Sequence, residues 1–306
     1  MTTGNTLTNG AVLAELRISQ WNAKLIDKSV ADRVAREYRA GEHAGKYHKD
    51  LMAGSSFHAK IKKYAQGIRN YHIEHTIPWT DRGPRLCTLA VLPEYKATMT
   101  AMIQQLEVMI EEFLYDTTSP NFYETQKRLA NQATVALGEL YREADYPTLE
   151  RVRTLYKVSL SFDPVPQAGD FRIDAVQGDL EFLRSQHAEA MDSRVRQVQE
   201  DIWGRLHKRL DMVRQKVVDM DKYYEAQANN EKLPRVLLQD DYLDTLRDMC
   251  GLLGKLNVTG DAKLDQARQD LLRTFEGVDN DDLKEDAGCR QQVAKQLEQI
   301  NNDYFC

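Results

Sequence analysis

Apolar residues recur on one face of the segment from Ala175 to about Asn229, and no proline interrupts the pattern. Steps of three and four residues are typical of a helix with one buried face, so we predict a single long helix here. Such a helix needs a partner, either the 94–142 segment of the same chain or a second copy. Its apolar seam consists of Val195, Val198, Ile202, Leu206, Leu210, Val213, Val217, Met220 and Tyr224. The residues to which we assign oligomerisation are Val195, Ile202, Leu206, Leu210 and Val213.

Shorter helical patterns fill most of the remaining chain. Each has apolar residues at helical spacing and is bounded by glycine, proline or short polar residues. The two patterns at 94–115 and 122–142 are separated by a turn, so we expect them to form an antiparallel pair. The predicted shorter helices are 12–39, 55–76, 94–115, 122–142, 147–155, 239–256, 261–275 and 283–300.

One segment changes period. Apolar residues alternate with polar ones from Tyr156 to Phe162 and again from Phe171 to Ile173. Strict alternation is typical of β-strands, so 156–173 is predicted to be a two-stranded hairpin and the only β-structure. The predicted fold class is therefore mainly α: an elongated helical bundle or coiled-coil hairpin with one small β-hairpin.

The stretch from Ile77 to Pro93, reading IPWTDRGPRLCTLAVLP, separates the helical patterns. Its prolines and glycine exclude a helix, so we predict an ordered joint. Trp79 is expected to be buried in it, and Trp79, Arg82 and Arg85 are the candidate partner-binding residues. The predicted segments are an N-terminal basic helical region at 1–76, the joint at 77–93, a long antiparallel helical coiled-coil region at 94–230 and an acidic C-terminal helical cap at 231–306.

Charge is distributed unevenly along the 306 residues. The formal net charge is −6, yet residues 1–96 sum to +6 and the remainder to −12. Such polarity can steer an anionic partner to the N-terminal part, or let the two ends attract their opposites on neighbouring copies. The region 46–85 offers an alternative nucleic-acid-binding surface, formed by Lys60, Lys62, Lys63 and Arg69.

Composition suits solvent-exposed amphipathic helices, with 29% charged and 42% apolar residues. No apolar run approaches the ~18 residues of a membrane span. The first ten residues lack the basic and apolar regions of a secretion signal, and the four cysteines are scattered as reduced thiols would be. We therefore expect a cytoplasmic protein that does not bind a membrane.

Candidate chemistry is sparse. His72, Glu74 and His75 lie within four residues, but their spacing matches neither orientation of the zincin motif, so a metal-dependent enzyme is only a third hypothesis. The acidic run from Asp279 to Asp286 lacks the glycine and glutamate of a calcium-binding loop. The sequence contains neither the glycine motifs of nucleotide binding nor the nucleophile elbow of acyl transfer. We expect no metal, no cofactor and no enzymatic activity.

Four short stretches carry a resemblance to a known family: TIPWTDRGPRL at 76–86, Tyr95, YP at 146–147 and FDPVPQAGDFRID at 162–174. With these motifs, most of the chain resembles a family of uncharacterised proteins encoded by bacteriophages and integrative mobile elements. Genes of that kind occur near AAA+ ATPases, von Willebrand A-domain proteins or phage recombination functions. The resemblance implies a helical accessory protein in a bacterial host cell, and no catalytic residue comes with it.

Taken together, the patterns favour a non-enzymatic phage or mobile-element protein that assembles with itself or binds a protein partner such as an AAA+ ATPase. We expect a homo-oligomer. The alternative is a nucleic-acid-binding accessory protein of recombination or replication that uses the basic region 46–85.

Overall fold

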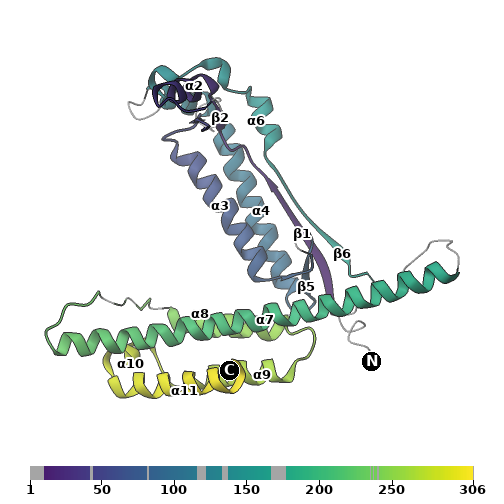
Figure 1. Cartoon of the computed structure of the whole chain (residues 1–306), viewed down its shortest axis with the longest axis vertical. Coiled ribbons are helices and arrows are strands. Elements are labelled where there is room, and N and C mark those ends of the chain that lie inside the picture. The colour runs from purple at the N-terminus through teal and green to yellow at the C-terminus, as the bar shows by residue number, and fades with distance from the viewer. Residues whose placement is uncertain are drawn as a thin grey trace. The chain divides into compact units, whose positions relative to one another are not determined.

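The computed structural model describes residues 10–41, 44–80, 83–115, 122–132, 137–166, 177–234, 236, 238–239 and 241–305. This part of the chain is mainly helical with a small antiparallel sheet, which confirms the predicted fold class at that level. The chain divides into two compact units, each built from segments that are far apart in sequence. Unit 1 comprises Met1–Glu15, Glu74–Tyr95 and Phe162–Cys306, and unit 2 comprises Leu16–Ile73 and Lys96–Ser161 (Figure 1).

The four-stranded sheet draws on the N-terminal residues and on the joint. β1 (Ala11–Ser19) pairs antiparallel with β5 (Arg85–Thr88), so that Val12 lies opposite Cys87. β5 also pairs with β4 (Ile77–Pro78), and the strand order is β4-β5-β1-β6. The joint is therefore ordered by backbone pairing as well as by its apolar side chains.

The helix predicted at 12–39 was wrong because its apolar spacing is ambiguous. Leu13 and Leu16 fit a helical step, but Leu16 and Ile18 alternate with charged residues as strand residues do. Backbone hydrogen bonds to β5 stabilise the strand conformation over the helix. Ala23 then adopts a left-handed φ of 54°, which a right-handed helix excludes. Within the predicted range only α2 (Lys28–Glu37) is an α-helix.

β6 (Lys157–Pro164) confirms a strand at the start of the predicted 156–173 hairpin. Its neighbour in the sheet is β1, because pairing within a larger sheet satisfies backbone groups that a marginal lone hairpin leaves exposed. A second, two-stranded sheet joins β2 (Lys24–Ile26) to β3 (His48–Asp50). The prediction of one β-hairpin as the only β-structure was therefore wrong. Phe171 and Ile173 lie outside the described residues.

The helices of unit 2 pack around an aromatic cluster. The rings of His58 and Phe113 are 5.8 Å apart and those of Trp21 and Tyr123 are 5.9 Å apart. His58 Nε2 lies 3.0 Å from the carbonyl oxygen of Trp21, and burial lowers the pKa of this histidine, which favours its neutral form. The helices of this region are α3 (Ser56–Glu74), α4 (Leu92–Leu114), α5 (Phe122–Gln132) and α6 (Leu149–Leu155).

The second helix predicted at 122–142 was too long. α5 ends at Gln132, and two short 3-10 turns follow, η1 (Gly138–Leu140) and η2 (Glu143–Asp145). Gly138 has a φ of 47°, outside the range of a right-handed helix. Leu137 and Leu140 are three apart, a spacing that suits an α-helix and a 3-10 turn equally well.

Unit 1 is built on α7 (Gln177–Ala228), which confirms the long helix predicted at 175–229. α11 (Ala287–Phe305), α8 (Tyr242–Leu256) and α9 (Ala262–Thr274) pack against it, and α10 (Asn280–Glu285) packs against α11 (Figure 1). The seam is covered by these helices of the same chain. Its buried residues are Val195, Val198, Ile202, Leu206, Leu210, Val213, Val217 and Met220.

Combining Ile202→Asp with Leu206→Asp is therefore expected to unfold unit 1 rather than to dissociate an assembly. Loss of one such buried side chain costs about 2–5 kcal/mol, and an unpaired buried charge adds to this cost. Thermal unfolding followed by circular dichroism measures the effect. Met212→Asp is the matched control, because Met212 lies on the same helix and is 51% exposed. A double variant that melts with the control would contradict the assignment of the seam to the core.

Candidate docking surface

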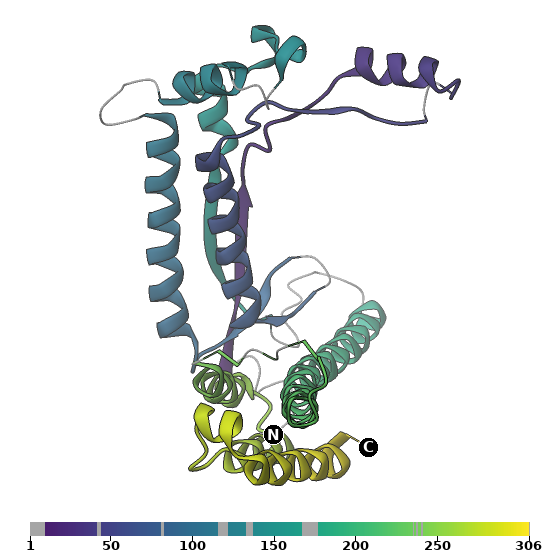
Figure 2. The same ribbon diagram turned by 90° about the vertical axis from the view of Figure 1, so that its left-hand side faces the viewer.

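β2, α2 and β3 form a substructure of unit 2 that we call the basic arm, residues 24–50. β2 and β3 pair antiparallel, with Leu25 opposite Lys49. α2 projects away from α3 and α4, as the purple helix at the upper right of Figure 2 shows. Val30 is the buried residue of α2, so most of the surface of this helix is open.

Local sequence accounts for both ends of α2. Asp27 is the N-cap, and its side chain accepts hydrogen bonds from the backbone N–H groups of Ser29 and Val30. Aspartate favours this position because its carboxylate satisfies N–H groups that have no partner within the helix. The helix ends at Tyr38, and Arg39 adopts a left-handed φ of 53° that turns the chain out of the helix.

A buried lysine anchors the basic arm within unit 2. The Lys49 side chain is 1% exposed, and its Nζ donates to Asp27 Oδ2 at 3.3 Å and to the carbonyl oxygen of Leu140 at 2.9 Å. Asp145 on η2 forms a second ion pair with the same ammonium group. The hydrogen bond from the Ser29 hydroxyl, helped by Lys49, lowers the pKa of Asp27 to about 2 against the opposing effect of burial. The Asp27 carboxylate therefore stays charged at neutral pH.

The outward surface of the basic arm is apolar to an unusual degree. Val34 and Tyr38 follow Val30 at four-residue steps, and they are 45% and 76% exposed. Leu25 and Ile26 are adjacent in β2 and are 37% and 46% exposed. Because adjacent strand residues point to opposite faces, neither face of the β2-β3 ribbon is fully covered. Exposed apolar side chains that gather on one element are typical of an interaction site.

Positive charge surrounds these apolar side chains. Among the described residues of the basic arm, the exposed anionic side chains are Asp32, Glu37 and Asp50. The exposed cationic side chains are twice as numerous: Lys24, Lys28, Arg33, Arg36, Arg39 and Lys46. A surface of this kind fits a partner whose own surface is negatively charged.

The predicted nucleic-acid residues on α3 have different roles. Lys60 and Lys63 are exposed. Lys62 Nζ donates to the carbonyl oxygen of Asn22 at 3.0 Å, and Arg69 donates to that of Ile18 at 3.2 Å. Arg69 therefore holds the end of β1 against α3, and Lys62 holds the connection from β1 to β2. The exposed side chains of Lys60 and Lys63 remain as candidates for a charged surface.

The joint residues belong to unit 1 and contact α7. Trp79 is buried, as predicted, at 4% exposure, and the guanidinium carbon of Arg194 lies 5.0 Å from its ring centroid. Arg85 donates to the hydroxyl and carbonyl oxygens of Thr76 at 2.7 and 3.0 Å. Arg205 of α7 donates to the same carbonyl oxygen at 2.7 Å. Arg82 lies outside the described residues, and partner binding at the joint stays a prediction.

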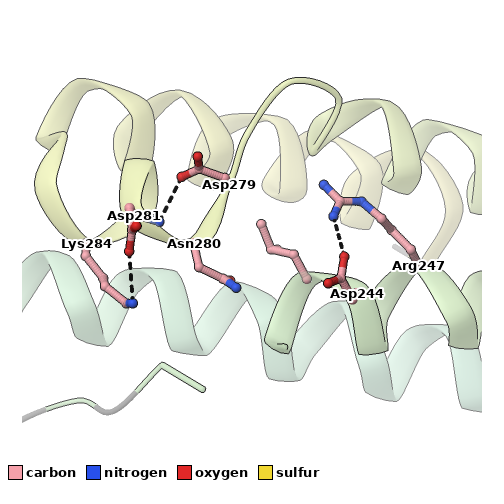
Figure 3. A pocket seen from close by; sticks show the side chains of 7 residues that line it. Asp244, Arg247, Asp279, Asn280, Asp281 and Lys284 are labelled. Carbon is pink, nitrogen blue, oxygen red and sulfur yellow. Dashed lines mark hydrogen bonds and ion pairs between the residues drawn. The ribbon is translucent and has the colours of Figure 1, made fainter. Parts of the chain in front are cut away.

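Two hollows, of about 330 and 390 Å³, lie in unit 1 and share Arg247 of α8. Figure 3 shows the first, which lies between α8 and α10. Arg247 pairs there with Asp244 at 2.9 Å, and Lys284 pairs with Asp281 at 3.1 Å. Asp279 caps the N-terminus of α10. Each cation of this hollow is therefore paired with a carboxylate, and we call the lining carboxylates of Asp244, Asp279 and Asp281 its rim.

Histidine and cysteine side chains do not form a recognisable reaction centre in the described part of the chain. His72 is buried on α3. Burial raises the pKa of Cys87 to about 12 and that of Cys250 to about 11, so both thiols are protonated at neutral pH. Within the described ranges, no group of three or more His, Cys, Asp or Glu side chains is placed to hold a metal ion.

The structure contains no helix, among the residues it describes, that is long and apolar enough to cross a membrane. No protein-family model, curated protein or solved structure matches the chain.

Sequence reasoning missed the basic arm because it assigned residues 12–39 to one helix. The local signal was present: Asp27 followed by Ser29 and an amphipathic run is typical of a helix N-terminus. The sequence pattern does not indicate that β2 and β3, the strands before and after α2, pair with each other. It also does not indicate that Lys49 is buried.

Lys49→Met is expected to destabilise unit 2 by about 3–5 kcal/mol, because removal of one partner leaves buried carboxylates without a counter-charge. Urea unfolding measures the loss, and hydrogen exchange should become faster in β2 and β3. Lys46→Met is the matched control, since Lys46 is an exposed lysine of the same segment. Equal stability and exchange for both variants would contradict the anchoring role of Lys49.

Proposed function

We propose that this chain is a non-enzymatic accessory protein that assembles with itself through the basic arm. The observation that carries the proposal is the solvent exposure of four apolar side chains. The exposed fractions of Leu25, Ile26, Val34 and Tyr38 range from 37% to 76%. They belong to a substructure whose base is fixed by the buried charge of Lys49. A well-anchored element with an uncovered apolar surface is suited to docking.

The expected strength of this contact follows from the area that remains to be buried. Complete burial of one large apolar side chain contributes about 1.5–3 kcal/mol. The four side chains of the basic arm are on average about half exposed. Their burial therefore contributes roughly half of that amount each. The four contributions sum to about 3–6 kcal/mol. Loss of translational and rotational freedom offsets this gain, so the apolar side chains of the arm support a reversible association only together with charged contacts and the partner's own surface.

The resemblance to phage and mobile-element proteins suggests that such an assembly works in a bacterial host cell. It also suggests a second protein, such as an AAA+ ATPase, that would work with the assembled form. The basic rim of the arm favours an acidic partner surface in either case, because opposite charges raise the association rate and orient the encounter.

Combining Val34→Asp with Tyr38→Ala is expected to weaken self-association at least tenfold. The aspartate places a charge in the apolar contact, and the alanine removes its largest ring. Sedimentation velocity at tens of micromolar measures the change in mass. Wild-type protein should sediment as a dimer or larger species, and the variant as a monomer with an unchanged melting temperature.

Val108→Asp is the matched control for this experiment. Val108 lies on α4 of the same unit and is 49% exposed, so its replacement tests whether any charge on an exposed apolar site disrupts the assembly. The control should assemble like the wild type. A wild-type protein that remains monomeric, or an arm variant that assembles normally, would contradict the proposal.

Nucleic-acid binding is the second candidate function, and the exposure of Lys60 and Lys63 favours it. Burial is the larger cause that lowers the pKa of Lys62, and the positive charge of Lys24 in the basic arm lowers it further. Lys24 is therefore near Lys62, and the two basic regions adjoin. A basic surface that continues from α3 onto the arm could follow a phosphate backbone.

If nucleic acid binds here, affinity should fall steeply as salt rises, because each phosphate contact releases counterions. Filter binding with duplex DNA and with single-stranded RNA measures this. Lys60→Glu with Lys63→Glu should abolish binding, whereas Arg151→Glu with Lys157→Glu, an equal change at exposed residues elsewhere in unit 2, should leave most of it. No binding by the wild type, or an equal loss in both variants, would eliminate this function.

A further inference from the structure

The C-terminal helices offer a surface that complements the basic arm. Residues 231–306 contain 16 Asp and Glu against 10 Lys and Arg. The hollow of about 330 Å³ between α8 and α10 has Asp244, Asp279 and Asp281 in its lining (Figure 3). Further carboxylates are exposed on the same two helices or at their ends: Asp248, Asp282, Glu285 and Asp286.

The lining of this hollow fits an aromatic side chain. Leu243 lines its base but is buried, so an incoming ring would pack mainly on Arg247 and Lys284, whose cations are favourable on the face of a ring. The same two positive charges would repel a metal ion from this hollow. The volume is at the lower end of the about 300–1,000 Å³ that ligand sites occupy, so the hollow suits one side chain rather than a chain segment.

Tyr38 has the geometry and surroundings to fill such a site. At 76% it is the most exposed large apolar side chain in the described part of the chain. It stands at the C-terminal end of α2, where the left-handed conformation of Arg39 turns the backbone away. Arg39 follows it, Arg36 lies two residues before it, and both are exposed, as is Glu37 between Arg36 and Tyr38. An exposed ring with two guanidinium groups nearby complements a hollow that has carboxylates in its lining.

We propose that Tyr38 of one copy enters the α8-α10 hollow of a second copy, with Arg36 and Arg39 facing the rim carboxylates. This inference rests on the proposed function, because it names the surface that the basic arm contacts. The arm and the hollow are different surfaces of the same chain. The contact is therefore head-to-tail, and repeated copies form a closed ring or continue as a filament.

Charge reversal at the rim is the first test. Asp244→Lys with Asp281→Lys removes two lining carboxylates that otherwise make only exposed ion pairs within three residues, which contribute little to folding. The variant should keep its melting temperature and lose at least tenfold in self-association by sedimentation velocity. Asp192→Lys with Glu200→Lys is the matched control, with the same change in net charge at exposed residues of α7 that do not line the hollow.

Mixing the two kinds of variant distinguishes a head-to-tail contact from other arrangements. The arm variant, Val34→Asp with Tyr38→Ala, keeps an intact hollow, and the rim variant keeps an intact arm. Each should be monomeric alone. An equimolar mixture should form a dimer and nothing larger, because only one productive arm-to-hollow contact is available between them.

The possible results separate this inference from the proposed function. If the arm variant dissociates but the rim variant assembles like the wild type, the arm docks elsewhere and only this inference falls. A mixture that stays monomeric overturns the head-to-tail pairing, as does equal dissociation of the rim variant and its charge-matched control. Normal assembly of the arm variant, or a monomeric wild type, overturns both. If the arm variant loses DNA binding and its assembly is unchanged, the arm is a nucleic-acid-binding surface. That result also overturns both.

Discussion

Antiparallel pairing of β1 with β5 is the interaction on which the rest of the structure depends. It pairs Ala11 to Ala14 with Arg85 to Thr88, and β1 continues to Ser19 with β6 as its other neighbour, so the N-terminal apolar residues belong to a sheet and not to a helix. It also gives the joint a backbone ladder, in addition to the burial of Trp79. Once the strand ends, the chain is free to form a separate ribbon and helix, and this is the basic arm.

The basic arm combines a costly interior with an uncovered exterior. Burying Lys49 requires two carboxylates and a backbone carbonyl around one ammonium group, an arrangement that gives orientation more than stability. The exterior leaves Tyr38 and Val34 largely in water. A fixed base reduces the conformational entropy that the arm would lose on docking, which makes a small apolar contact more effective.

The two units differ in how they use charge. In unit 1, α7 buries its seam under α8, α9 and α11, and the carboxylates of the C-terminal helices remain outside. In unit 2, the cations of the arm surround exposed apolar side chains. The proposed contact between copies rests on these opposite charges together with the apolar exposure of the arm.

The sequence by itself determined the helical character, the length of α7 and the presence of a strand at β6, because an uninterrupted period of 3.6 or of 2 is a local property. It also indicated the burial of Trp79 and the charge asymmetry. Only the tertiary structure decided that residues 11–19 are a strand and that the α7 seam is filled by the same chain. Leu13 and Leu16 fit both periods, and a seam has the same spacing whichever helix covers it. The arm depends on Lys49 meeting Asp27 and Asp145, residues 22 positions before it and 96 after it, and no local pattern encodes a contact across that separation.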